Sequence, residues 1–242
     1  MSQLNNNFLT VYEKLFQSFG PQHWWPGDTQ TEIIVGAVLT QNTNWGNVEK
    51  ALGNLRKQNL LDVAKIHKIS QERLARLIKP AGYFNVKARR LKNLIKFIIG
   101  RYQGDLKLMA RTPLGDLRKE LLGVNGVGPE TADSILLYAF NKPVFVVDAY
   151  TKRFLYRHNL IDPQDSYHTV QELFTANLKS DRKFFNEYHA LIVRLGKDFC
   201  KPTPRCEQCP LKDFHYSIER RCAHCFRHLP LAQICSHCDT NV

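Results

Sequence analysis

The stretch LGVNGVGPETA at residues 122–132 decides the fold, because glycines and a proline stand between two apolar helical segments. Gly126 and Gly128 have no Cβ, so both can adopt positive φ and leave backbone N–H groups uncovered. Pro129 suits the first position of a helix, whose N-terminal N–H groups attract an anion. The sequence therefore predicts a helical hairpin whose turn holds a phosphate. An ordinary helical corner with glycines at the bend is the alternative.

Apolar residues recur at helical spacing on both sides of this turn. The predicted helices cover residues 8–19, 33–39, 48–60, 87–99, 117–122, 131–140, 149–158, 167–178 and 184–195. Only the apolar run at 144–147 resembles a strand, and so short a run does not separate a strand from a buried connector. The class is therefore expected to be all-α.

The chain of 242 residues is basic, with a formal net charge of +12. Such an excess favours a polyanionic partner, above all nucleic acid, although it also fits a protein that is merely kept in solution by its charge. No apolar run approaches the length that spans a bilayer, and the N-terminus lacks the basic and apolar regions of a signal peptide. We expect a cytoplasmic protein with no membrane partner and no signal peptide.

All seven cysteines lie between Cys200 and Cys238, and three CxxC pairs occur among them. An odd number of cysteines gathered at one end of a chain without a signal peptide argues against a disulfide framework. The pairs indicate metal ligation, and residues 215–242 are expected to form a Cys-rich, metal-binding C-terminal tail of the zinc-knuckle type.

The pattern G-V-G-x-x-T-A after an apolar helix resembles the helix-hairpin-helix of the endonuclease III superfamily of DNA glycosylases. The order of the other features is similar, since Asp148 closes the apolar run after the hairpin and cysteines end the chain. The resemblance covers about residues 8–215. It implies a monomeric base-excision-repair enzyme that flips a damaged base out of double-stranded DNA and hydrolyses its glycosidic bond.

The same resemblance implies two helical domains with the active-site cleft between them. The first domain would be a helical barrel at residues 28–140 that ends in the hairpin motif at about 117–140. The second would combine residues 1–27 with 141–214 and end in an iron–sulfur type of cysteine loop.

Asp148 matches the catalytic aspartate of the superfamily, although an Asp before a helix is more often an N-cap. A carboxylate there would stabilise the positive charge that develops on the deoxyribose. Bifunctional members carry an attacking lysine where this chain has Glu130, so the resemblance implies a monofunctional enzyme. The alternatives are a lyase that uses Lys152 or Lys197, and a DNA-binding module without catalysis.

Trp24, Trp25 and Pro26 form an aromatic cluster near the start of the chain. This segment resembles the corresponding segment of the 3-methyladenine branch of the superfamily. Flat aromatic faces would sandwich the flipped base and would favour a cationic alkylated purine, whereas core packing is the structural alternative. The predicted base pocket is made of Trp24, Trp25, Pro26, Trp45 and Lys197.

Gln41 matches the polar wedge that fills the place of the flipped base, and a surface amide at a helix end is its alternative. The other residues predicted to contact DNA are Gly126, Gly128, Thr131 and Lys152.

The superfamily often carries a four-cysteine [4Fe-4S] loop after its last helix. Cys200, Cys206 and Cys209 match three of its ligands, and His215 stands at the place of the fourth, with Cys222 as the other candidate. A second zinc site at these cysteines is a further alternative. Two later CxxC knuckles suit a tetrahedral Zn²⁺ with four thiolates. The predicted zinc ligands are Cys222, Cys225, Cys235 and Cys238.

Overall fold

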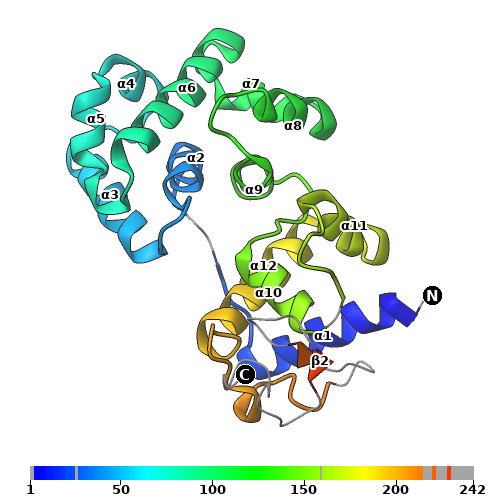
Figure 1. Cartoon of the computed structure of the whole chain (residues 1–242). Coiled ribbons are helices and arrows are strands. Elements are labelled where there is room, and N and C mark those ends of the chain that lie inside the picture. The colour runs from blue at the N-terminus through cyan, green and yellow to red at the C-terminus, as the bar shows by residue number, and fades with distance from the viewer. Residues whose placement is uncertain (1–2, 25–26, 159, 215–219, 222–227, 230–242) are drawn as a thin grey trace. The chain divides into compact units, whose positions relative to one another are not determined.

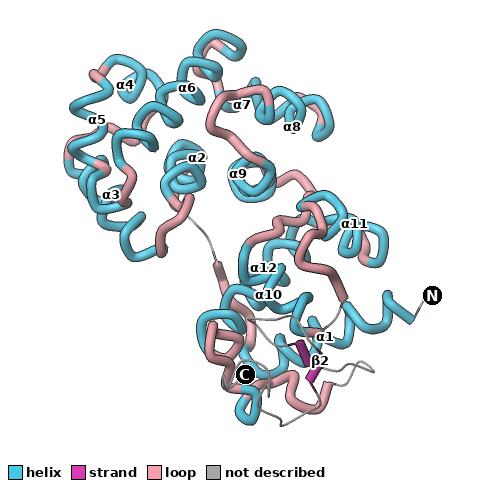
Figure 2. The backbone as a smooth tube through the Cα atoms, in the orientation of Figure 1, coloured by secondary structure: helices cyan, strands magenta, loops and turns pink. Residues whose placement is uncertain are grey.

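The computed structural model of the chain describes residues 3–24, 27–158, 160–214, 220–221 and 228–229. Apart from the strands β1 (Arg220–Arg221) and β2 (His228–Leu229), which pair antiparallel, the elements described are helices (Figure 2). The predicted all-α class is therefore confirmed. None of the helices in the described ranges combines the length and the apolar character needed to cross a bilayer.

The chain divides into two compact units. The first unit joins Met1–Trp24 to Phe145–Val242, and the second is the continuous segment Trp25–Val144. The expected domain boundaries at residues 28 and 140 lie a few residues inside the second unit.

The second unit is built around α6 (Phe84–Tyr102), against which α4 (Val63–Lys68) and α5 (Gln71–Leu77) pack (Figure 1). In the same unit, α2 (Gln30–Leu39) packs on the short helix η2 (Ile135–Ala139). The other elements of this unit are α3 (Trp45–Lys57), η1 (Lys79–Ala81), α7 (Leu106–Arg111), α8 (Leu114–Leu122) and α9 (Pro129–Ser134).

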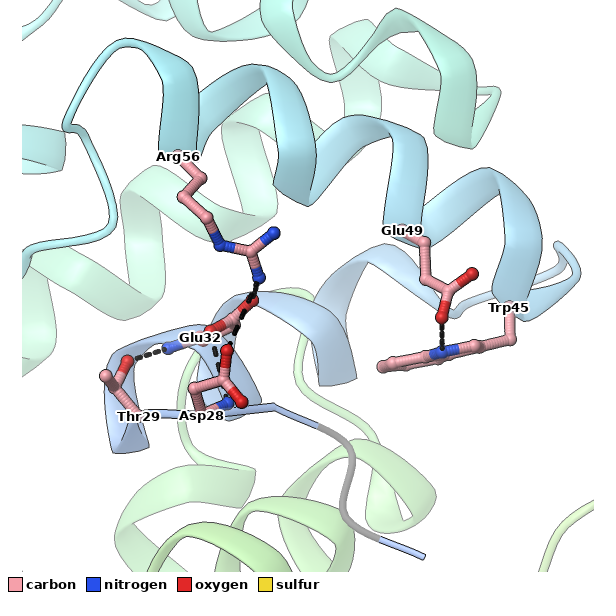
Figure 3. Close-up of polar contacts among 6 residues, drawn as sticks. All are labelled: Asp28, Thr29, Glu32, Trp45, Glu49 and Arg56. Atoms are coloured by element: carbon pink, nitrogen blue, oxygen red, sulfur yellow. Dashed lines mark hydrogen bonds and ion pairs between the residues drawn. The ribbon is translucent and has the colours of Figure 1, made fainter.

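The start of α2 is fixed by a capping contact and a buried carboxylate (Figure 3). The Thr29 hydroxyl accepts a hydrogen bond from the Glu32 N–H, as expected for an N-cap. The buried Glu32 side chain pairs with Arg56 of α3 and accepts a 3.2 Å hydrogen bond from the Asp28 N–H. The backbone that enters α2 is thus tied to α3.

The first unit has an aromatic core. The Phe145 and Phe174 rings stack at a centroid distance of 3.7 Å, and the Tyr188 hydroxyl donates to the Phe8 carbonyl at 2.8 Å. The Tyr188 bond joins α12 (Arg182–Asp198) to α1 (Gln3–Phe19), and the Phe8 and Phe174 rings, 4.8 Å apart, join α1 to α11 (Tyr167–Asn177). The helix α10 (Ala149–Arg157) packs against α12. The short helix η3 (Cys206–Gln208) follows α12 in this unit.

The apolar run at residues 144–147 is a buried connector and not a strand. Side chains of α11 take the place of a neighbouring strand: Gln171 donates to the Phe145 carbonyl at 2.6 Å, and the Tyr167 hydroxyl accepts from the Val147 N–H at 3.3 Å. Since buried backbone groups need partners, these contacts hold the chain just before Asp148.

Candidate active site and hairpin

Asp148 is the N-cap of α10. Its Oδ1 accepts hydrogen bonds from the Thr151 N–H at 2.7 Å and from the Thr151 hydroxyl at 2.8 Å. Its other oxygen, Oδ2, lies 3.5 Å from Nε2 of His189, a contact that is longer than an ordinary hydrogen bond. The side chain keeps 12% of its surface exposed. The carboxylate therefore caps the helix with one oxygen and turns the other toward an imidazole.

The pKa of Asp148 reflects opposing effects. Burial, the largest, raises the pKa of this carboxyl, whereas His189 and the Thr151 hydrogen bonds lower it, and the net pKa is below the ordinary value for aspartate. Asp148 is therefore ionised at neutral pH despite its burial. An ionised carboxylate is the form that stabilises a developing cation or accepts a proton from water.

Within the first unit, Trp24 joins this pair. Its ring stacks on the His189 ring at a centroid distance of 5.3 Å and an interplanar angle of 24°. Of the other predicted pocket residues, Trp25 and Pro26 lie outside the described residues. Lys197 is exposed, about two turns beyond His189 on α12.

Trp45 belongs to the second unit, where it begins α3. Its indole Nε1 donates to Glu49 one turn further along at 3.0 Å, and this bond holds the ring along the helix (Figure 3).

His189 was not singled out by the sequence. It is only 4% exposed and stands among the apolar positions of α12, where a histidine reads as a core residue. No local pattern marks its contact with Asp148, because the two residues meet only when α10 packs on α12.

The turn joins α8 to α9 as the sequence predicts, and its two glycines differ in conformation. Gly126 adopts a φ of 98°, which favours glycine, but Gly128 has φ −93° and ψ 176°, an ordinary extended conformation. Of the two glycines that can adopt positive φ, only Gly126 does so. The Gly126 and Gly128 N–H groups donate to no backbone acceptor in the part of the chain that the structure describes. Such groups can bind a phosphate.

The back of the turn is closed by α6. A Cβ added to Gly126 would lie 2.3 Å from Cγ of Arg90, so the arginine stem occupies the space of a side chain. Asn93, one turn further along, donates to the Asn125 carbonyl at 3.1 Å. These contacts from α6 therefore hold the backbone of the turn in place without a bound ligand.

Gln41 is bonded to the same hairpin. Its Nε2 donates to the Gly126 carbonyl at 3.1 Å and to the buried Thr131 hydroxyl at 2.9 Å, while its Oε1 accepts from Arg90. The loop that carries Gln41 is anchored by the buried Lys87, whose Nζ donates to the Leu39 carbonyl at 2.9 Å. The predicted wedge and the predicted phosphate site are therefore parts of one hydrogen-bonded network.

Glu130 lies exposed in the first turn of α9, directly after Pro129. A carboxylate there interacts favourably with the positive end of the helix dipole, which is a structural reason for its presence. Lys152, predicted to contact DNA, donates from Nζ to the Asp165 carbonyl at 2.8 Å.

The helix that Asp148 begins also holds the cysteine loop. Arg153 donates to the Cys200 carbonyl at 2.6 Å. Arg157 donates to the Lys201 carbonyl at 2.6 Å and reaches Cys200 Sγ at 3.4 Å. Two arginines of α10 therefore fix the chain at the first predicted metal ligand.

The cysteine loop has features that suit thiolate ligands. Cys200, Cys206 and Cys209 are free and half-buried, and Cys209 Sγ accepts from the Leu211 N–H at 3.4 Å. Burial, together with the neighbouring cysteines, raises the pKa of Cys209 to about 11, and a metal ligand must be a thiolate, so metal binding at this sulfur would release its proton. No group of three His, Cys, Asp or Glu side chains in the described ranges is arranged around a metal position. The expected ligands His215, Cys222, Cys225, Cys235 and Cys238 lie outside those ranges.

Comparisons with known proteins agree on one family. Residues 35–180 match the family model of the HhH-GPD superfamily base excision DNA repair proteins. A protein of Methanocaldococcus jannaschii named as a DNA repair glycosylase is 48% identical over 84% of this chain and 93% of its own length. Endonuclease III of Thermotoga maritima is 29% identical over 78% of this chain and 83% of its own.

Among solved structures, the H. pylori 3-methyladenine DNA glycosylase bound to 1,N6-ethenoadenine has a TM-score of 0.68 and 30% identity, covering 79% of this chain and 97% of that one. A non-covalent endonuclease III–DNA complex has a TM-score of 0.75 at 22% identity, covering 88% and 95%, and it shares the fold. The chain is therefore a DNA glycosylase that belongs to the HhH-GPD superfamily of base excision DNA repair proteins.

Proposed function

We propose that this protein is a monofunctional DNA glycosylase that flips an alkylated purine out of duplex DNA and hydrolyses its N-glycosyl bond. The observation that carries the proposal is the state of Asp148, which is ionised, largely buried and held at the start of α10. As the bond to the base breaks, positive charge develops on the deoxyribose, and a fixed carboxylate stabilises that charge or orients the attacking water.

The monofunctional assignment rests on Glu130. An amine is needed to attack the sugar and form a Schiff base, and a glutamate carboxylate cannot supply it. Of the two other lysines considered, Lys152 donates to a backbone carbonyl and Lys197 is exposed on α12. Water is therefore the proposed nucleophile, and an abasic site is the proposed product.

The alkylated-purine assignment rests on two supports. The H. pylori relative with 30% identity is a 3-methyladenine DNA glycosylase bound to an adenine adduct. In this chain the Trp24 ring lies beside His189, next to Asp148. An electron-rich ring attracts a cationic purine, and such a purine leaves as a neutral base, so the enzyme needs less help from a general acid.

One experiment tests both parts. Duplexes that each carry a single lesion, including 3-methyladenine, 1,N6-ethenoadenine, thymine glycol and 8-oxoguanine, are incubated with the protein and analysed with and without hot alkali. We expect release of alkylated purines and strand cleavage only after alkali. Release of oxidised pyrimidines alone would refute the substrate class, and efficient borohydride trapping on abasic DNA would refute the monofunctional mechanism. Absence of release from every duplex would favour a DNA-binding module.

A further inference from the structure

The imidazole of His189 lies between an aromatic ring and the candidate catalytic carboxylate. On one side the Trp24 ring stacks on it at 5.3 Å, and on the other its Nε2 is 3.5 Å from Oδ2 of Asp148. The Phe145 ring stands perpendicular to the imidazole at a centroid distance of 6.5 Å. Two segments that are distant in the sequence, one carrying Trp24 and the other carrying Phe145 and Asp148, therefore surround one buried histidine of α12.

The two oxygens of Asp148 are held differently. Oδ1 accepts two hydrogen bonds from Thr151 of its own helix, which fixes one end of the carboxylate to the start of α10. Oδ2 faces His189 of α12, so the rotation of the carboxylate about its bond to Cβ is set across two helices. A cap alone needs only the first of these contacts.

We propose that His189 is a positioning residue for base excision: it holds Oδ2 of Asp148 in the orientation from which the carboxylate acts on the sugar, and the Trp24 ring holds the imidazole. This inference rests on the proposed function, since it gives His189 a role only where Asp148 acts in catalysis.

The surroundings of the pair support a role beyond packing. Burying an imidazole and a carboxylate carries a desolvation cost that an apolar side chain at position 189 would avoid. Trp24 and Phe145 contribute rings that do not titrate, and Thr151 contributes a neutral hydroxyl, so His189 and Asp148 are the titratable groups that face each other here. Burial raises the pKa of Asp148, and His189 acts against it.

The test compares His189→Leu, His189→Gln and the neighbouring variant Tyr188→Phe. Leucine removes the polar group at similar volume, and glutamine keeps an N–H donor but cannot take up a proton. Tyr188→Phe removes the buried hydrogen bond from the same helix to the Phe8 carbonyl, a bond that does not involve Asp148. This variant serves as the structural control. Each variant is assayed for thermal unfolding, duplex affinity and the single-turnover rate of base release across pH, on the lesion that the wild type releases fastest.

We expect His189→Leu to lose at least about tenfold in the single-turnover rate, which is the low end for a group that orients a catalytic residue. The acidic limb of its pH profile should move to higher pH, because only the Thr151 hydrogen bonds then oppose the effect of burial on the pKa of Asp148. His189→Gln should recover most of the rate at neutral pH but not the position of the acidic limb. Tyr188→Phe should keep the single-turnover rate and the acidic limb of the wild type. The duplex affinity of all three variants should stay within about twofold of the wild-type value.

The outcomes separate this inference from the proposed function. A wild-type rate and pH profile in His189→Leu, combined with an inactive Asp148→Asn, would overturn the role of His189 alone. Normal release by Asp148→Asn would overturn the proposed mechanism itself. If His189→Leu does not fold, His189→Gln decides, since an acidic limb identical to that of the wild type would overturn the proposal.

Discussion

The side-chain amide of Gln41 donates a 2.9 Å hydrogen bond to the hydroxyl of Thr131, which joins the loop after α2 to the first turn of α9. A second bond from the same amide reaches the Gly126 carbonyl. The residue proposed to replace the flipped base is therefore attached to the turn proposed to hold the DNA backbone. Binding of a DNA phosphate by the turn and insertion of Gln41 into the duplex would therefore be coupled through these two hydrogen bonds.

Gln41→Ala should lower the rate of base release from a fully paired duplex by about tenfold, because no side chain would then fill the space of the extruded base. The loss should be smaller when the lesion faces a mismatch, since extrusion from a weakened pair costs less. Thr131→Val is the matched control, because it removes the hydrogen bond and leaves the amide. Equal losses in the two variants would show that Gln41 only braces the hairpin.

Gly126→Ala should destabilise the protein, whereas Gly128→Ala should not. At Gly126 a new Cβ would meet the Arg90 stem at a φ of 98°, and the combined strain and clash cost about 2 kcal/mol or more. At Gly128 nothing lies within 4 Å of the added Cβ, and φ is negative. Thermal unfolding of the two variants checks this difference, and equal melting temperatures would contradict it.

Asp148→Asn should reduce base release by at least about 10²-fold while duplex affinity stays within about twofold. Asparagine is also a good N-cap, so the variant keeps the start of α10 and removes the charge. Single-turnover release and a binding titration on undamaged duplex measure the two effects. Turnover near that of the wild type would show that Asp148 serves only as the N-cap of α10.

Stability should depend on pH through the same carboxyl. The pKa of Asp148 is lower in the folded protein than its ordinary value of 3.8, so its stabilising contribution is complete above that value and is lost as pH falls through the lower, folded value. The difference in unfolding free energy between wild type and Asp148→Asn should therefore shrink from about pH 7 to about pH 3. Urea unfolding of both proteins measures it, and a difference independent of pH would contradict the shifted pKa.

The long helices were predictable because their apolar periodicity extends over several turns, as in α1, α6 and α12. The short helices α4, α5 and α7 were not, since six or seven residues carry too little pattern. In α4 the reason is visible: the carbonyls of Ile66, His67 and Ile69 at its C-terminal end are bound by Nζ of Lys92 from α6. That support comes from the tertiary structure, and no local sequence signal contains it.

The residues of the candidate site likewise differ in whether a local sequence pattern or only the tertiary packing identifies them. The hairpin and the carboxylate that follows it are local motifs, and the sequence located both. Which of the two glycines adopts positive φ was not predictable, because a glycine permits this conformation without requiring it. His189 was missed because its role depends on the packing of α10 against α12, and a buried histidine in an amphipathic helix looks like any core residue.

The last prediction concerns the cysteine-rich end of the chain. We propose that Cys200, Cys206 and Cys209, with His215, hold a [4Fe-4S] cluster, and that the two later CxxC pairs hold one zinc ion. The purified protein should then be brown, with iron and about one zinc per chain by elemental analysis. The half-buried thiols and the N–H groups near Cys200 and Cys209 Sγ fit thiolate ligands that are stabilised by hydrogen bonds.

Separate ligands should give separable losses. His215→Ala should release iron and spare zinc, whereas Cys235→Ala should do the opposite, and iron retained in His215→Ala but lost in Cys222→Ala would assign the fourth ligand to Cys222. A colourless protein with two zinc ions would show that Cys200, Cys206 and Cys209 hold a second zinc ion and not an iron–sulfur cluster. Because Arg153 and Arg157 bind the loop at Cys200 and Lys201, loss of its metal should also lower the melting temperature of the first unit. Thermal unfolding before and after chelation measures this shift, and an unchanged melting temperature would show that α10 holds the loop without metal.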